Sequence, residues 1–251
     1  LILINSLKKE AAITTAGVFS IPTGETWNGI TNFVASVTQM DFLKSFWYSL
    51  VISVMSVVLI MLCCSMAAWY IVRVNGKLSK IFYYLCVFSM VVPFQMVMFT
   101  LAKTADTLHL NNPYNICIIY LGFGAGLAVF MFTGFIKSIP VSLEEAAMID
   151  GCSIMQISFK IVFPVIRPII MTVAILNAMW IWNDYLLPSL MLGQNGKVKT
   201  LPVAVQAFVG SYVKQWDLIL TAALLAMIPM IIVFLLAQKQ IMNGMVEGAI
   251  K

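Results

Sequence analysis

Five long apolar runs constrain this chain more than any other feature of its sequence. Each has the roughly 20 residues that an α-helix needs to cross about 30 Å of hydrocarbon at about 1.5 Å per residue. Because a backbone in lipid must satisfy its own hydrogen bonds, the runs predict helices. We therefore expect an all-α polytopic membrane protein. The runs lie at about 46–72, 81–102, 114–136, 161–187 and 217–237.

The composition agrees with lipid as the solvent of these runs. The chain is 61% hydrophobic and 10% charged, and its mean hydropathy is +0.97. A soluble domain carries roughly a quarter charged residues. We expect residues 1–251 to form a single transmembrane domain. The net charge of +5 is not gathered into a basic stripe, so we expect no nucleic acid partner.

The first residues predict a further helix ahead of the chain. "LILINSLKKE" has the character of the outer end of a span followed by a charged exit. We expect an earlier span before Leu1. A cleaved signal peptide is the alternative, but no small-residue cleavage site is visible.

The residue types needed for catalysis or metal binding do not come together in the sequence. His109 is the only histidine, and the five cysteines lack the spacing of metal ligands. "GQNGKVKT" has two residues between its glycines, where a P-loop needs four. "GFGAG" at 122–126 lies inside an apolar run, so it indicates close helix packing through small residues. We expect no enzyme activity, bound cofactor or metal site in this chain.

The loops predict how the chain crosses the membrane. "RVNGKLSK" at 73–80 is a tight basic turn, and the positive-inside rule would place it in the cytoplasm. Of the 15 lysines and arginines, eight fall on that side, so the total count decides little. This orientation puts the connection 138–160 in the cytoplasm and the segment 188–216 outside.

The connection 138–160 contains "EEAAMIDG", an acidic stretch between two apolar runs. Ser142 followed by Glu145 predicts a capping box, with the glutamates in the first helical turn. Gly151 suits the left-handed position that ends a helix. Ser153 and Gln156 repeat the capping pattern and predict a second short helix.

This predicted helix carries small and polar residues on one face. Leu143, Ala146, Ala147 and Asp150 lie at spacings of three, four and seven. The alanines would let another surface approach the backbone closely. An interfacial helix on lipid headgroups is the alternative. Three carboxylates argue against it, because the cytoplasmic leaflet is anionic. We therefore favour a docking element for a cytoplasmic protein.

The stretch "EEAAMIDGCSIMQISFKIVFP" resembles the EAA motif of permease subunits of binding-protein-dependent ABC importers. The spacing of the motif is kept throughout, and Phe163 in place of leucine is an apolar exchange. The matching residues are Glu145, Ala146, Ala147, Gly151, Ile161, Phe163 and Pro164.

More of the chain is similar to one branch, the carbohydrate importers with a maltose-type second permease. The similar stretches are "WIWNDYLLPSL" at 180–190, "TLPVAVQAFVG" at 200–210 and the tail "QKQIMNGMVEGAIK". Together with the EAA segment, the resemblance covers essentially the whole chain. It implies the bundle of a type I ABC importer permease. Six spans are usual in this branch, so the first would be largely missing before Leu1.

The resemblance also implies partners and a location. A second permease, usually a different chain, would complete the path for a sugar, with an oligosaccharide as the expected cargo, in a bacterial cytoplasmic membrane. Two cytoplasmic ATPase subunits would use ATP and Mg²⁺, and an extracellular solute-binding protein would deliver the sugar. The EAA segment would be the coupling helix seated on an ATPase. Its contact residues would be Glu144, Glu145, Ala146, Ala147, Asp150 and Gly151.

Polar residues near the end of the run 161–187 are candidates for the substrate path. Asn177, Trp180 and Asp184 lie at spacings of three and seven, on one helical face, and Asn183 points elsewhere. An aromatic ring beside amide and carboxylate groups suits a sugar. The alternative is helix-to-helix hydrogen bonding, with Trp180 and Trp182 as interfacial belt residues. Gln95, next to Pro93 in an earlier run, is a weaker candidate.

Within the outer segment 188–216, Leu201, Val205 and Phe208 have helical spacing. A short amphipathic helix there could contact a binding protein or pack on its own bundle.

Other functions remain as alternatives. A permease of the same superfamily could carry another solute, such as a polyamine or glycerol phosphate. A secondary transporter or channel working alone would be expected to have charged residues deep in several spans and internal repeats. The sequence shows neither, and that function leaves "EEAAMIDG" unexplained.

Overall fold

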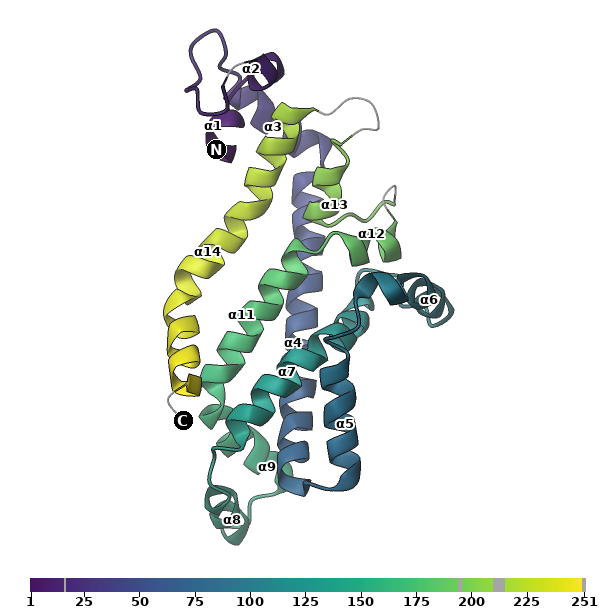
Figure 1. Cartoon of the computed structure of the whole chain (residues 1–251), viewed down its shortest axis with the longest axis vertical. Coiled ribbons are helices and arrows are strands. Elements are labelled where there is room, and N and C mark those ends of the chain that lie inside the picture. The colour runs from purple at the N-terminus through teal and green to yellow at the C-terminus, as the bar shows by residue number, and fades with distance from the viewer. Residues whose placement is uncertain (16, 194–195, 210–214, 250–251) are drawn as a thin grey trace.

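The computed structural model describes residues 1–15, 17–193, 196–209 and 215–249, with side chains of the last helix described up to Gln238. These residues form helices and connecting loops, and one isolated β-bridge joins Lys8 to Trp27. The predicted all-α class is confirmed. Figure 1 shows a long, narrow bundle whose main helices run along its length, with α8 at one end and α1 to α3 at the other.

The central element is α4, Phe42–Val74, a helix of 33 residues. It packs along α7, Ile116–Ile136, and against α11, Arg167–Asn183. Buried apolar side chains from all three helices form the main core. Gly124 and Gly126 allow close approach, because a Cβ on Gly126 would lie 2.7 Å from the carbonyl oxygen of Cys86. Gly124 and Gly126 of "GFGAG" therefore serve helix packing, whereas a Cβ on Gly122 would meet open space.

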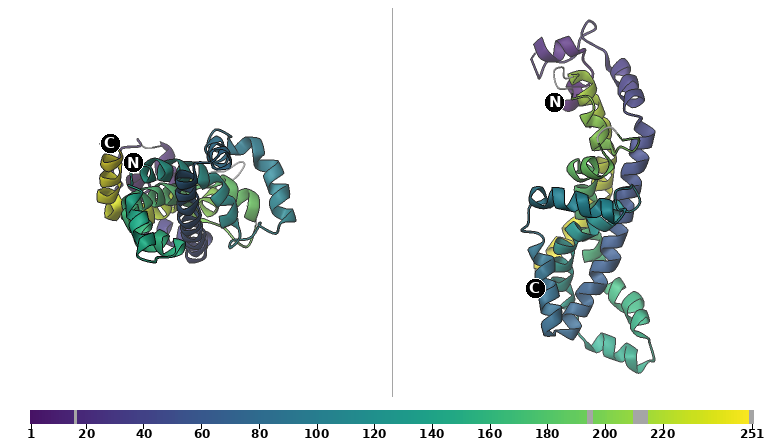
Figure 2. Two further views of the ribbon diagram at one scale, coloured as in Figure 1. Left: turned by 90° about the horizontal axis from the view of Figure 1, so that it is seen from below. Right: turned by 90° about the vertical axis from the view of Figure 1, so that its right-hand side faces the viewer.

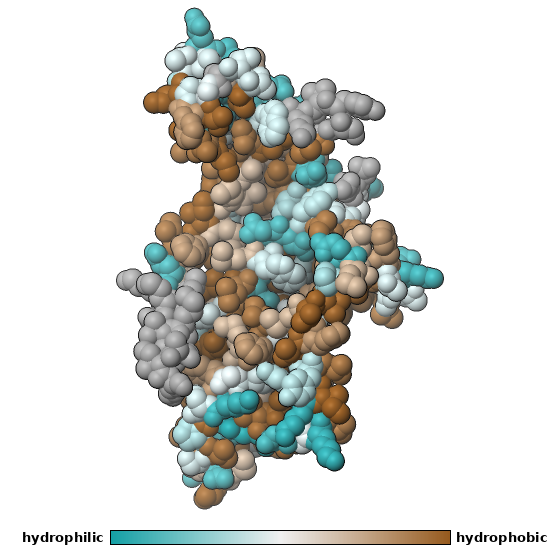
Figure 3. Space-filling view, in the orientation of Figure 1, coloured by the Kyte–Doolittle hydropathy of each residue, from teal (hydrophilic) through white to brown (hydrophobic). Residues whose placement is uncertain are grey.

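Three of the predicted spans correspond to single long helices. The runs 46–72 and 217–237 lie within α4 and within α14, Trp216–Ala249, and the run 114–136 contains α7. Each of these helices is long and apolar enough to cross a membrane. In Figure 3 hydrophobic side chains cover much of the middle of the molecule, while hydrophilic ones gather at both ends and in a group at mid-height.

The predicted span at 81–102 is two helices instead. α5, Lys77–Phe88, ends before a short break, and α6, Phe94–Thr107, then runs in a different direction (Figure 1). Pro93 explains the break, since it has no N–H to donate and it disfavours helical backbone in the residue before it. Pro93 has extended backbone at φ −63° and ψ 136° and precedes the first turn of α6.

The predicted span at 161–187 is also interrupted. Its start falls in a π-helical turn at Ser158–Val162, which follows α9, Ile154–Ile157, and leads into α10, Phe163–Val165. The chain then bends by 78° before α11. Two prolines lie beside this bend, and each removes a backbone donor from the helical ladder. α11 ends at Asn183, and α12, Leu186–Leu192, follows it.

The end of the bundle opposite α8 is built from short helices around the start of α14. These are α1 (Ile2–Asn5), α2 (Glu10–Thr15), α3 (Gly29–Gln39) and α13 (Leu201–Gln206). Leu201 and Phe208 are buried in a second apolar cluster with residues of α14. α13 therefore packs on its own bundle. Figure 2 shows this end and the projecting α8 and α9 segment at opposite ends of the long axis.

Candidate functional site

The acidic segment folds as α8, Ser142–Ile149, and projects from the end of the bundle (Figure 2). The predicted capping box at Ser142 is wrong, because Val141 precedes the helix with helical backbone angles and no side chain caps it. The backbone N–H of Glu145 donates to the carbonyl of Val141 at 3.1 Å. Ser142 therefore lies inside the first turn, where its hydroxyl cannot act as the cap.

The end of α8 follows the sequence prediction. Gly151 has φ +81°, a left-handed backbone that non-glycine residues rarely adopt. The capping box of the next helix is also present. Ser153 Oγ accepts from the N–H of Gln156 at 3.4 Å, and Gln156 Oε1 accepts from the N–H of Ser153 at 2.8 Å. Local chemistry therefore fixes the turn that joins α8 to α9.

Glu144 is turned toward its own bundle and is only 3% exposed. Its Oε1 accepts from Arg73 Nε at 2.9 Å and Nη2 at 2.7 Å, and its Oε2 accepts from Trp69 Nε1 at 3.0 Å. Arg73 Nη2 also donates to the carbonyl of Ile139 at 3.2 Å. Arg73 and Trp69 belong to the last turns of α4. The expectation that Glu144 contacts another protein is therefore corrected, since this carboxylate ties α8 to α4.

The other predicted contact residues divide between two faces of α8. Glu145, Ala146, Asp150 and Gly151 are exposed, as expected for a docking surface. Ala147 is buried against the core, so its assignment to the exposed face is wrong. It lies three residues after Glu144, and both share the inward face of the helix.

The exposed surface of α8 and α9 also carries apolar side chains that the sequence reasoning missed. Ile149 is 86% exposed and projects at the end of α8. The sequence does contain a signal for this surface, because large apolar residues stand near the end of a short acidic helix. Exposed apolar side chains that lie together often mark an interaction surface. We call this set the α8 tip: Leu143, Met148, Ile149, Ile154 and Met155.

At the far end of α11, Asn177 does not face an open path. It is 3% exposed, and its Nδ2 donates to the carbonyl of Val173 at 2.9 Å. A Cβ on Gly124 would lie 2.8 Å from its Oδ1, so the amide lies where α11 meets α7. The interpretation as a helix-packing residue therefore holds for Asn177 in this structure.

Asp184 lies just beyond α11 and connects two elements. Its Oδ2 accepts from the hydroxyl of Tyr120 at 3.0 Å, and its Oδ1 accepts from the N–H of Leu186 at 3.0 Å. Tyr120 belongs to α7 and is fully buried. Sequence reasoning missed Tyr120, although a tyrosine inside an apolar run needs a polar partner. Asp184 thereby fixes the turn between α11 and α12.

Among the residues predicted to line the substrate path, Trp180 has a large side chain that a ligand could contact. Its side chain is 44% exposed, and its ring meets that of Tyr120 edge-on, with centroids 5.6 Å apart. Asn183 is also exposed and lies on the same side, contrary to the expectation that it points elsewhere. We call the uncovered stripe the open face of α11: Leu176, Met179, Trp180 and Asn183.

Gln95, the weaker path candidate, and Trp182, the possible belt residue, lie apart from this face. Gln95 is exposed in the first turn of α6, a helix that contacts α12. Trp182 is buried, and its Nε1 donates to the carbonyl of Ala226 in α14 at 3.1 Å. Trp182 is therefore a packing residue between helices and does not form an interfacial belt. Among the described residues, no three histidine, cysteine or acidic side chains cluster as metal ligands would.

Comparison with known proteins agrees with this arrangement. Residues 60–246 match the family described as "Binding-protein-dependent transport system inner membrane component". The probable starch degradation products transport system permease protein AmyC of Thermoanaerobacterium thermosulfurigenes is 37% identical over 100% of this chain and 90% of its own length. The multiple sugar-binding transport system permease protein MsmG of Streptococcus mutans is 37% identical over 82% of this chain and 76% of its own.

A third relative and one solved structure extend the comparison. The melibiose/raffinose/stachyose import permease protein MelC of Bacillus subtilis is 36% identical over 88% of this chain and 80% of its own. The fold matches a chain of a bacterial ABC transporter involved in import of the acidic polysaccharide alginate. The TM-score is 0.75 at 21% identity, over 95% of this chain and 88% of that one. The chain therefore belongs to the family of binding-protein-dependent transport system inner membrane components.

Proposed function

We propose that the chain is one membrane-spanning subunit of an ATP-driven importer of sugars, with an oligosaccharide as cargo. The names of its relatives support this cargo, since they refer to starch degradation products, multiple sugars and melibiose, raffinose and stachyose. The family description supports a place in the bacterial cytoplasmic membrane. The chain itself would contribute no ATPase site.

The proposed assembly has a second permease, two cytoplasmic ATPase subunits that use ATP and Mg²⁺, and an extracellular solute-binding protein. The observation that supports this proposal best is the construction of α8. Its inward face is tied to α4 by the Glu144 ion pair, while the α8 tip offers exposed apolar side chains away from the bundle. A helix held rigidly on one side and uncovered on the other is suited to transmit a partner's movement.

The tie to α4 gives this movement a route through the membrane. Charge-assisted hydrogen bonds are stronger than neutral ones, and three of them join Glu144 to the end of α4. When the ATPase subunits close, displacement of the α8 tip would carry the end of α4 with it. Rigid-body rotation of helices is a common way to change access from one side of a membrane to the other.

The sugar path would run along the open face of α11. The exposed ring of Trp180 offers a flat apolar surface for the CH face of a sugar, and Asn183 offers an amide for its hydroxyl groups. Asp184 and Tyr120 would act as positioning residues, because their hydrogen bond holds the turn after α11. The second permease would cover this face and complete the path.

The proposal is tested by reconstituting the permease in proteoliposomes with a second permease, an ATPase and a solute-binding protein from the same organism. We expect accumulation of radiolabelled raffinose or maltotriose that requires ATP. Uptake that proceeds without the ATPase subunits would contradict the proposal, and so would ATP-driven uptake of putrescine or glycerol 3-phosphate with no sugar uptake. Trp180→Ala should raise the KM for sugar uptake, while Met171→Ala serves as the control, because Met171 is an exposed apolar residue of α11 outside the open face.

A further inference from the structure

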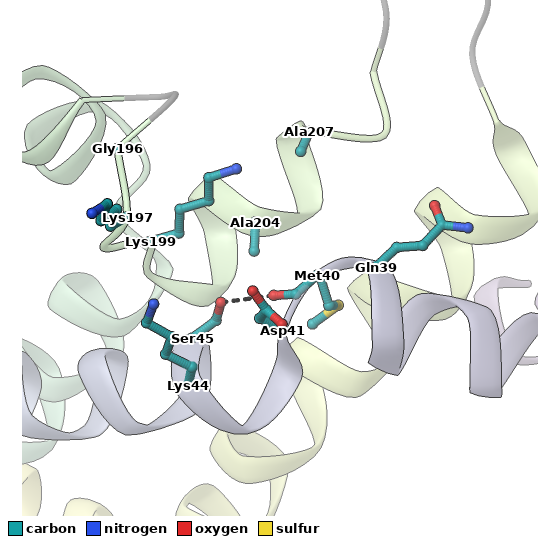
Figure 4. Close-up of a pocket in the computed structure, with 10 residues that line it drawn as sticks. All are labelled: Gln39, Met40, Asp41, Lys44, Ser45, Gly196, Lys197, Lys199, Ala204 and Ala207. Atoms are coloured by element: carbon teal, nitrogen blue, oxygen red, sulfur yellow. Dashed lines mark hydrogen bonds between the residues drawn. The ribbon is translucent and has the colours of Figure 1, made fainter.

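A polar pocket of about 250 Å³ lies at the end of the bundle opposite α8. It is formed where α3 turns into α4 and where the segment before α13 passes over that turn (Figure 4). Asp41 has φ +47° at the turn, and Ser45 Oγ donates to the carbonyl of Met40 at 2.9 Å. The floor is thus held in place by backbone geometry and by buried Ser45 and Met40.

Three lysines, Lys44, Lys197 and Lys199, line this pocket. Figure 4 shows Lys44 extending from α4 toward the segment that carries Lys197 and Lys199, with the carboxylate of Asp41 between the elements. Among the described residues, the single ion pair within 4 Å is that of Arg73 and Glu144 at the other end of the molecule. None of the three ammonium groups is therefore neutralised by a described carboxylate. The three lysines outnumber the single carboxylate of Asp41, so the pocket has a net positive charge that favours an anionic group.

The position of the pocket indicates which anion it meets. Lys44 precedes Arg73 by 29 residues on the same helix, which corresponds to about 43 Å of helix length. A bilayer with its headgroups is about 40–45 Å thick. With Arg73 at the cytoplasmic boundary, the pocket opens at the outer edge of the membrane toward water. The cavity is smaller than the roughly 300–1,000 Å³ of ordinary ligand sites, so it fits a side chain better than an oligosaccharide.

We propose that this pocket is a docking site for an acidic side chain, an aspartate or glutamate, on the outer solute-binding protein. This inference rests on the proposed function and adds to it a specific contact and its charge. The Asp41 carboxylate repels any anion at close range, so charge alone does not separate a carboxylate from a lipid phosphate. The small volume of the pocket and its opening toward water favour a side chain of a docked protein over a phosphate that is attached to a lipid. A mobile acidic side chain can approach the three lysines from the water side.

The test compares wild type with the triple variant Lys44→Gln, Lys197→Gln and Lys199→Gln in the complete transporter. The transporter is placed in nanodiscs of phosphatidylcholine alone, and ATP hydrolysis is measured against the concentration of the sugar-loaded binding protein of this importer. We expect the half-saturating concentration to rise about tenfold, since exposed charge pairs are individually weak. The maximal rate should be unchanged, and high salt should weaken wild-type docking more than that of the variant. Lys103→Gln is the matched control, an exposed lysine on α6 outside the pocket.

The other outcomes are distinct. If wild type responds to the binding protein and the triple variant responds with the same half-saturating concentration, the docking site is wrong while the importer function stands. If the difference appears only after phosphatidylglycerol is added to the nanodiscs, the pocket binds a lipid headgroup and the proposal is overturned. If wild type shows no response to any binding protein, the importer function and the docking site both fail.

Discussion

Glu144→Ala provides the most direct test of how α8 is held. The substitution removes the carboxylate that accepts hydrogen bonds from Arg73 and Trp69, and it leaves the exposed residues of α8 in place. Since the backbone of α8 is unaltered, any loss of function must come through the position of the helix. We expect α8 to detach from the end of α4 without unfolding of the membrane bundle.

The size of the effect follows from the burial of the pair. Removing one partner of a buried ion pair costs about 3–5 kcal/mol, because the other charge is left unpaired. Arg73 has 18% of its side chain exposed, so water can compensate part of this loss. We therefore expect a smaller loss of about 2–3 kcal/mol. At about 1.4 kcal/mol for each tenfold change, the detached state should become roughly 30- to 150-fold more populated.

Hydrogen exchange measured by mass spectrometry can detect this change. Exchange of the α8 amides in Glu144→Ala should accelerate by that factor, while amides of α7 keep their wild-type rates. ATP hydrolysis in the reconstituted complex should lose its dependence on the binding protein. Glu145→Ala, a neighbouring exposed glutamate, is the control and should leave the exchange of α8 unchanged. Wild-type protection of α8 in Glu144→Ala would refute the anchoring role.

Three further substitutions test separate parts of the structure. Gly151→Asp should abolish coupling of ATP hydrolysis to transport while the bundle stays folded, because a left-handed backbone costs a non-glycine residue about 1–2 kcal/mol; normal transport in this variant would contradict the role of the turn. Tyr120→Phe should lower the thermal stability of the detergent-solubilised protein by about 1–3 kcal/mol, since Asp184 loses a donor in a partly buried site; an unchanged Tm would show that Asp184 does not need this bond. Gly126→Ala should strongly reduce the amount of folded protein on size-exclusion chromatography, whereas Gly122→Ala, which has open space around it, should be tolerated.

The features that sequence predicted well depend on local rules. The long apolar runs of the sequence predicted α4, α7 and α14, because a lipid-facing helix must be apolar along its length. Gly151 and the Ser153 capping box were predicted from residues within a few positions of each other. The EAA motif could also be recognised from local information, since all its residues lie in one continuous segment. In each case the decisive interaction is made by neighbours in the chain.

The features that sequence missed depend on distant or competing residues. Glu144 could not be assigned to α4, because its partner Arg73 lies 71 positions earlier in the chain. Tyr120 and Asp184 are separated by 64 positions and meet only after α7 and α11 pack together. The break before Pro93 was hidden because apolar residues continue on both sides of it. The composition of a segment indicates whether it lies in lipid or in water. Whether its helix continues or breaks depends on which residues have a backbone N–H that can donate a hydrogen bond.

The continuity of α4 gives the two ends of the molecule a physical connection. Its 33 residues contain neither proline nor glycine, so no position favours a kink. Lys44, in the first turn of α4, lines the pocket that we propose for the binding protein, and Arg73, in its last turn, holds Glu144 of α8. A displacement at either end would therefore move the helix as a unit. In α5 and α6, by contrast, the break before Pro93 would absorb such a movement.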